Sequence, residues 1–223
     1  MGPVFLAKMF CPVRKQTNVI PPDNKDELLH LITLPFDTER LQLRRFTPDD
    51  LEAYSTYHRL PEVYRYLYAP TPDNAQLADQ LAQAIASRFC QDGDIFYCAV
   101  TLKDSGELIG EVLLKLANRA ALQAEIGYIF SPAYAGKGYA SEAVQAVLDR
   151  GFNQVGCHRI FARLDAANQG SIGVVERLGM RKEAHLRQND RFNGQWGDEL
   201  IYALLKEEWP SAAMKRQPAS WPH

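Results

Sequence analysis

The segment Ala135-Gly136-Lys137-Gly138-Tyr139-Ala140 has the residue types of an anion-binding loop. It lies between a predicted strand and a predicted helix, and its two glycines allow a sharp turn that exposes several backbone N–H groups. These donors and the helix dipole attract anions, above all phosphate groups. The alternative is an ordinary strand-to-helix turn that binds no ligand.

The loop differs from two common nucleotide-binding patterns. The P-loop spacing GxxxxGK(S/T) is missing, and the dinucleotide pattern GxGxxG would need a glycine where Ser141 stands. A nucleotide-phosphate enzyme is therefore the weakest hypothesis that these glycines allow.

Composition and charge exclude several classes of protein. The 223 residues are 46% hydrophobic and 23% charged, which is typical of a globular protein with a sizeable core. Binding to nucleic acid needs an excess of Lys and Arg to neutralise the phosphates, and the net charge of this chain is -2. We therefore expect no nucleic-acid partner. The four cysteines form no CxxC pair and the five histidines have no ligand spacing, so we expect free thiols and no metal.

The apolar segments are too short to cross a bilayer, so no membrane partner is expected. The first basic residue, Lys8, lies inside the early apolar stretch, whereas a signal peptide carries its positive charge before that stretch. These features favour the cytoplasm.

The elements around the glycine loop alternate between strands and helices. Strands are predicted at Leu41–Phe46, Ile95–Leu102, Glu107–Leu116, Gln123–Phe130, His158–Leu164, Arg181–Asp190 and Glu199–Leu205. Helices are predicted at Pro48–His58, Asn74–Phe89, Gly138–Phe152 and Gln169–Leu178. Connections between residues 95 and 130 are too short for parallel neighbours, so these strands form an antiparallel meander. The fold class is α/β (mixed α+β), with a central mixed, mostly antiparallel twisted sheet flanked by helices.

The chain is predicted to contain one large domain. Residues 1–35 have no sustained period and form a partly mobile appendage, with a short helix around Asp26–Ile32. Residues 36–210 form the domain, and residues 211–223 form a tail. Near the end of the domain, Asn193-Gly194 predicts a tight hairpin.

The order of these elements resembles the Gcn5-related N-acetyltransferase (GNAT) superfamily. Its signature Q/R-x-x-G-x-G/A is matched at Gly138 and Ala140, whereas Ala135 stands where glutamine or arginine is usual. Asn168-Gln-Gly-Ser171 before a helix and Leu178-Gly-Met180 at its end are supporting marks.

Within the superfamily, the sequence is most similar to the branch of ribosomal-protein-alanine N-acetyltransferases. The marks are Thr38-Glu-Arg-Leu-Gln-Leu-Arg44 at the start of the domain, and Asn193-Gly194 followed by Trp196 and Asp198 near its end. The resemblance covers residues 41–209.

The resemblance implies the acyl-CoA N-acyltransferase fold and acetyl-CoA as donor. The pyrophosphate would lie on the N–H groups of residues 136–141, and pantetheine would lie along the strand that ends at residue 130. The implied cofactor-binding residues are Tyr128, Ile129, Phe130, Gly136, Lys137, Gly138, Tyr139, Ala140, Ser141 and Asn168. For Lys137, a solvated loop position is the alternative.

Direct transfer needs a base for the ammonium and an acid for the leaving thiolate. The resemblance implies Ser171 as the acid, with a helix-start hydrogen bond as its alternative role, because Val175 stands where many relatives have a catalytic tyrosine. It implies Asp190 as the base, with an exposed turn position as the alternative. Glu125 is a second candidate base, for which an ion pair or an edge role is the alternative.

Five tyrosines gather around the first helix and the following loop. Such density indicates core packing, but in this family the region covers the acceptor cleft, so some of them are expected to shape that pocket. They are Tyr54, Tyr57, Tyr64, Tyr66 and Tyr68.

The leading hypothesis is an acetyl-CoA-dependent N-acetyltransferase that works by direct attack of a primary amine. The acceptor is a protein N-terminus or a small-molecule amine, and the protein is a monomer or a homodimer. The alternative is a non-catalytic acyl-CoA sensor, because Ala135 and Val175 depart from the family pattern.

Overall fold

The computed structural model describes residues 32–209, so almost all of the predicted appendage and the whole of the tail lie outside the described residues. The described chain forms an eight-stranded sheet in the order β1-β2-β3-β4-β5-β6-β8-β7. The strands are β1 (Phe36–Asp37), β2 (Leu41–Arg44), β3 (Ile95–Leu102), β4 (Leu108–Asn118), β5 (Gln123–Phe130), β6 (Arg159–Asp165), β7 (Arg181–Phe192) and β8 (Gln195–Leu205). The pairs are antiparallel except for β5 with β6, which confirms the predicted mixed sheet and its meander.

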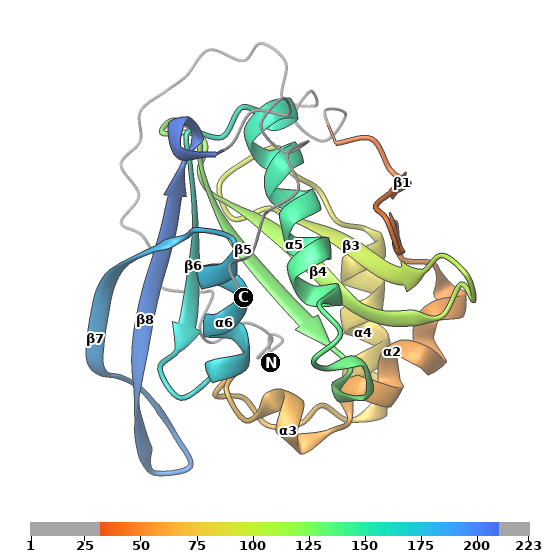
Figure 1. Cartoon of the computed structure of the whole chain (residues 1–223). Helices are drawn as coiled ribbons and strands as arrows, with labels where there is room; N and C mark the ends of the chain where they lie inside the picture. Colours follow the sequence, from red (N-terminus) through yellow and green to blue (C-terminus); the bar gives the residue numbers. More distant parts are fainter. Residues whose placement is uncertain (1–31, 210–223) are drawn as a thin grey trace, which may run out of the picture.

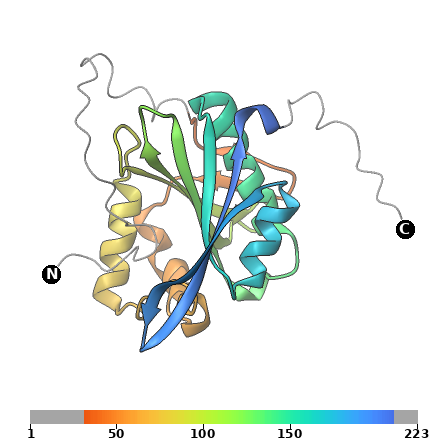
Figure 2. The same ribbon diagram turned by 90° about the vertical axis from the view of Figure 1, so that its left-hand side faces the viewer.

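Helices cover both faces of this sheet. They are α2 (Leu51–His58), α3 (Pro61–Tyr64), α4 (Asn74–Ile85), α5 (Tyr139–Arg150) and α6 (Gln169–Arg177), and a π-helical turn (Gly151–Val155) continues α5. Figure 1 shows α5 and α6 in front of the strands and α2 and α4 behind them. Figure 2 shows the sheet between α4 and α6. Within residues 32–209, no helix combines the length and apolar character needed to cross a bilayer.

The side chains of β5 alternate between two cores. Ala124 and Ile126 are buried in the large core that contains the apolar side of α5. Ile129 packs on the smaller core, which contains Leu77 and Leu81 of α4. Because strand side chains alternate, Glu125 and Gly127 share the face of Ile129, which is the face of the sheet that α2 and α4 pack against.

The parallel pair β5–β6 separates soon after it begins. Its register covers only Gln123 to Glu125 of β5, paired with Arg159 to Phe161 of β6. Beyond that point β5 remains paired with β4 as far as Phe130, so its other edge has no partner strand in β6. In Figure 1 the two arrowheads diverge, with α3 below the space between them. The sheet therefore has an internal open strand edge.

The structure differs from the predicted elements mainly at their ends. Helix α4 stops at Ile85 rather than Phe89, because Phe89 leaves the helix to pack edge-on against Phe96 in the other core, with ring centroids 6.4 Å apart. The short helix α3 was not predicted. At the amino-terminal boundary, Ile32 is buried in the large core, so packing begins before residue 36.

The last hairpin is longer than predicted on both arms. Asn193 and Gly194 have φ of 49° and 80°, which is the geometry of the predicted two-residue turn. The predicted strands ended at Asp190 and resumed at Glu199, whereas the observed strands meet this turn directly. The residues by which the observed strands exceed the predicted ones are exposed or half-buried. They therefore lack the alternation of apolar and polar residues that predicts a strand.

Candidate functional site

The glycine loop has the conformation that anion binding requires. Gly136 and Gly138 have φ of +75° and +80°, a left-handed region that side chains with a Cβ rarely adopt. Gly138 is the N-cap of α5, and the first N–H donated within the helix comes from Glu142 to the carbonyl of Gly138. The N–H groups of residues 139–141 therefore have no acceptor inside the helix and are free to hold an anion.

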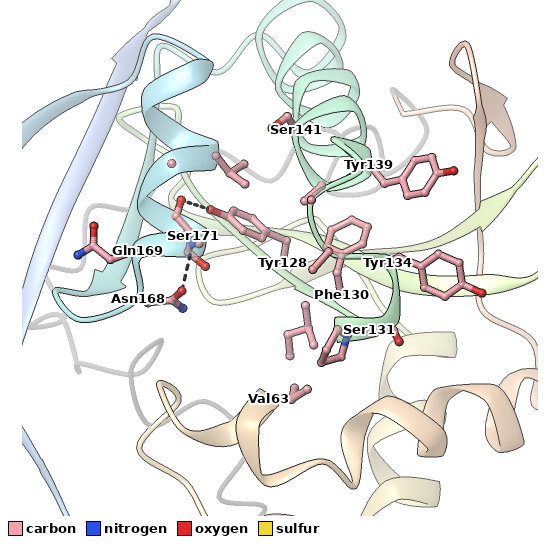
Figure 3. Close-up of a pocket in the computed structure, with 18 of the residues that line it drawn as sticks. Val63, Tyr128, Phe130, Ser131, Tyr134, Tyr139, Ser141, Asn168, Gln169 and Ser171 are labelled. Carbon is pink, nitrogen blue, oxygen red and sulfur yellow. Dashed lines mark hydrogen bonds between the residues drawn. The ribbon is translucent and has the colours of Figure 1, made fainter.

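A cavity of about 710 Å³ extends from this loop to the open edge of β5. Nine of the ten predicted cofactor-binding residues line it, as Figure 3 shows for those that it labels. These nine are Tyr128, Ile129, Phe130, Gly136, Gly138, Tyr139, Ala140, Ser141 and Asn168. The tenth, Lys137, does not line the cavity, and its Nζ lies 5.1 Å from the ring centroid of Tyr134.

Arg40 fixes the loop from behind. Its guanidinium donates to the Lys137 carbonyl at 2.9 Å and to the Glu142 carboxylate at 2.7 Å, and it stacks over Tyr139 at 4.5 Å. Partial burial opposes ionisation of Glu142, but hydrogen bonds from Thr38 and Arg40 outweigh that effect and lower the pKa of the carboxyl. The start of the domain thus holds the loop in shape, a role that the sequence motif alone did not reveal.

Three residues connect the end of β5 with the start of α6. The Asn168 side chain accepts a hydrogen bond from the Ser171 N–H at 3.0 Å. The Tyr128 hydroxyl donates to the Ser171 carbonyl at 2.8 Å, and both bonds are drawn in Figure 3. Burial raises the pKa of Tyr128, so its hydroxyl stays protonated near neutral pH. Ser171 is therefore held in place through its backbone.

Arg177 is a cavity residue that sequence reasoning missed. Of the described residues that line the 710 Å³ cavity, Glu62 and Arg177 carry the charged side chains. The Nε of Arg177 donates to the Ser141 hydroxyl at 3.2 Å, beside the amino-terminal turn of α5. A basic residue in the last turn of a helix is common, so its position in α6 did not distinguish it in the sequence.

A second, smaller cavity of about 120 Å³ lies on the side of the sheet that α2 and α4 cover. Side chains of β3, β4, β5 and β6 and of the segment after α3 line it. The residues that it shares with the first cavity are Tyr66, Leu67, Tyr128, Ile129, Asn168 and Ser171. The two cavities therefore meet where β5 and β6 separate.

Glu125 lies in this second cavity at the point where the strands part. Its side chain is 3% exposed, and burial raises its pKa to about 7 despite the opposing charges of Arg163 and Lys115; Glu199 raises it further. Arg163 donates to both carboxylate oxygens of Glu199, so much of its charge is already balanced. A carboxyl with a pKa near 7 exchanges protons readily at neutral pH.

Asp190 lies outside both cavities. It stands on β7 opposite Gly197, is half-buried, and accepts a hydrogen bond from the Arg191 N–H at 2.9 Å. The pKa of Tyr68 is raised by burial, by a hydrogen bond to Asp165 and by the charge of Asp190, but Tyr68 lines neither cavity. The structure thus brings Ser171 and Glu125 to one cavity and leaves Asp190 on the adjoining hairpin.

Comparison with known proteins identifies the family. The family model for the acetyltransferase (GNAT) domain matches residues 40–181. The chain therefore belongs to the GNAT acetyltransferase family, as predicted from its sequence. The matched residues include the glycine loop and the residues at which the two cavities meet.

Individual relatives agree with this assignment. The uncharacterized N-acetyltransferase YnaD of Bacillus subtilis is 34% identical over 77% of this chain and 97% of YnaD. The ribosomal protein uS5-alanine N-acetyltransferase of Escherichia coli is 26% identical over 77% of this chain and 91% of that enzyme. The structure of Mycobacterium smegmatis RimJ in complex with CoA-disulfide matches with a TM-score of 0.64 and 26% identity, over 79% of this chain and 87% of RimJ. The predicted similarity to the ribosomal-protein-alanine branch is confirmed, and the chain is an N-acetyltransferase by family.

Proposed function

We propose that this protein transfers the acetyl group of acetyl-CoA to a primary amine by direct attack. The observation that carries the proposal is the junction of two cavities at the β5–β6 separation. A donor entering on the α5–α6 side and an acceptor entering on the α2–α4 side would meet there. Holding both reactants at one point converts a bimolecular reaction into an effectively unimolecular one.

The larger cavity is the proposed donor site. The pyrophosphate would lie on the N–H groups of residues 136–141, with Arg177 as a nearby cation. The pantetheine amides would pair with the free edge of β5 like an added strand, and Asn168 would contact the same arm. The complex of RimJ with CoA-disulfide supports coenzyme A as the ligand, because RimJ shares this fold.

Two carboxylates are proposed as alternative bases for the acceptor ammonium. Glu125 is favoured, because it lines the acceptor cavity and its raised pKa of about 7 suits proton abstraction at neutral pH. Asp190 would act through a water relay, since it lines neither cavity. Comparing amide variants of both residues decides between them.

Ser171 is the proposed acid for the leaving thiolate. It lines both cavities, and hydrogen bonds of its backbone to Asn168 and Tyr128 hold the residue at their junction. As the amine nitrogen bonds to the acetyl carbon, the carbon–sulfur bond breaks and the thiolate takes a proton from the hydroxyl. The alkoxide then recovers, through water, the second proton that the nitrogen loses as the amide forms, so the hydroxyl is restored and no hydroxide is left over.

The test is a calorimetric titration with acetyl-CoA followed by thiol detection with a panel of amines. We expect binding, and thiol release that depends on the amine. Binding without release from any amine, including an alanine-first peptide, would favour the non-catalytic sensor instead. Absence of binding would contradict the donor site itself.

A further inference from the structure

Glu111 is a buried carboxylate in the acceptor cavity that the proposed chemistry does not use. It lies on β4, is 2% exposed, and lines the 120 Å³ cavity together with Glu125. Its Oε1 lies 3.6 Å from Nε2 of His58, whereas its Oε2 has no hydrogen-bond partner among residues 32–209. Leaving a buried acceptor unpaired is costly, so this oxygen indicates a missing partner that donates hydrogen bonds.

The neighbours of Glu111 favour a cation as that partner. Nδ1 of His58 shares a hydrogen bond with the Tyr64 hydroxyl at 2.9 Å, while Nε2 of the same ring faces Glu111. Tyr64 and Tyr97 line the cavity, and burial followed by the charge of Glu111 raises the pKa of both hydroxyls. Neutral aromatic rings around a carboxylate form a favourable site for an ammonium group.

The overall charge of the cavity agrees with a cationic ligand. Its described lining includes the carboxylates of Glu111, Glu125 and Asp165 and one guanidinium, that of Arg163. Arg163 is bound to Glu199, as described above, and Asp165 accepts a hydrogen bond from the Ala167 N–H at 2.7 Å. The carboxylate of Glu111 belongs to neither of these pairs and faces His58 of α2 instead.

The carboxylates at the two ends of the cavity are separated along the strands. Glu111 pairs with Ile129 and Lys115 pairs with Glu125, so Glu111 and Glu125 lie about 13 Å apart along the strand direction. Gly127 and Leu113 form a paired, apolar floor between them. A volume of about 120 Å³ is far below the ~300–1,000 Å³ of pockets for drug-sized ligands, so only a slender chain fits.

We propose that the acceptor carries two ammonium groups joined by a short unbranched alkyl chain, and that Glu111 binds the group that does not react. The reacting amine would lie at the β5–β6 separation near Glu125. This inference rests on the proposed function for the reacting end, but the Glu111 site makes its own prediction about binding.

The test measures the binding of matched amines to the full chain saturated with coenzyme A. Calorimetry compares diaminoalkanes of three to six carbons with 1-aminoalkanes of equal length. A hydrogen bond to a charged partner predicts that the preferred diamine binds about 10–100-fold more tightly than its monoamine. Glu111→Gln should reduce this ratio below about threefold, whereas the exposed Asp104→Asn, with the same change of charge, should keep it.

A second variant keeps the test decisive if Glu111→Gln does not fold, as judged by thermal unfolding. Glu111→Asp retains the charge but withdraws the carboxylate by one methylene, so the preferred diamine should become one carbon longer. Equal binding of diamines and monoamines to the unmodified protein, or a preference that survives Glu111→Gln, would overturn the proposal.

Turnover separates this inference from the proposed function. The kcat/KM for diamines should exceed that for an alanine-first peptide, and the reverse order would show a protein N-terminus as the acceptor and overturn the Glu111 assignment. Failure of every amine and peptide to release thiol would instead contradict the proposed function. The binding ratios would still decide whether Glu111 holds an ammonium group.

Discussion

The two cavities that meet at the β5–β6 separation are built in different ways. The donor cavity depends on backbone: left-handed glycines, the N–H groups at the start of α5, and the open edge of β5. The acceptor cavity depends on side chains, chiefly carboxylates and tyrosines from segments far apart in the chain. The first arrangement suits a ligand that stays constant, as proposed for acetyl-CoA, whereas single substitutions can change the second without altering the fold.

The difference is also electrostatic. The donor cavity offers N–H groups and Arg177 to an anion. The acceptor cavity offers Glu111, Glu125 and Asp165 to a cation. Under the proposed function each half would attract one reactant and disfavour the other, so changes in one cavity should affect one reactant selectively.

The largest expected effect is on the donor side. In Gly138→Trp the indole would fill the anion site and the residue would be strained at φ of +80°, so acetyl-CoA affinity should fall by more than about 100-fold, as measured by calorimetry. Gly106→Trp is the matched control, because Gly106 has φ of +73° in the β3–β4 turn with open space around it. Unchanged affinity in Gly138→Trp would refute the donor assignment.

The next effect belongs to the acceptor side. Glu125→Gln should lower kcat by about 10²–10⁴-fold while leaving acetyl-CoA affinity nearly unchanged, because a general base is lost but the donor cavity is not. Asp190→Asn is the matched comparison and should lower kcat far less. If Asp190→Asn has the larger effect, the hairpin carboxylate is the base.

The pH profile tests the same carboxylate without relying on a single rate. Glu125 accepts a proton only when ionised, so kcat/KM should rise with pH through a midpoint near 7. In Glu125→Gln that rise should disappear. A rise that persists with the same midpoint in the variant would assign the titration to another group.

The free energy of unfolding should depend on pH, because ionising the buried carboxyl of Glu125 destabilises the folded state. The folded pKa of about 7 lies above the usual 4.5, so the folded state binds the proton more tightly and stability falls as pH rises between these values. Relative to the unmodified protein, Glu125→Gln should therefore gain at most about 3 kcal/mol between pH 4.5 and pH 8. Thermal unfolding at both pH values measures the change, and a constant difference would contradict the raised pKa.

The smallest effects distinguish the cations beside the glycine loop. Arg177→Ala should weaken acetyl-CoA binding about tenfold, because Arg177 lines the donor cavity. Lys137→Ala should weaken it by less than about twofold, because Lys137 points to Tyr134 instead. Calorimetric titration with acetyl-CoA at low and high salt measures both affinities. A larger loss of affinity in Lys137→Ala than in Arg177→Ala would show that Lys137 is the cation that contacts the donor.

The sequence predicted the donor side better than the acceptor side for a physical reason. The glycine loop, the helix that follows it and the meander are encoded by adjacent residues, and the family resemblance that rests on them implied nine residues that line the donor cavity. Glu111 lies within a run of buried residues on β4, and nothing in the local pattern distinguishes it from a strand residue with an ordinary partner. Its significance arises from His58 on α2, which only the folded chain brings to it.

The most direct test of the two-cavity account is a crystal structure of the protein with bound coenzyme A. The account predicts the pyrophosphate at residues 136–141, pantetheine along the free edge of β5, and the sulfur at the junction beside Tyr128 and Ser171. Coenzyme A bound elsewhere, or with its sulfur directed away from the second cavity, would contradict the central claim that donor and acceptor meet where β5 and β6 separate.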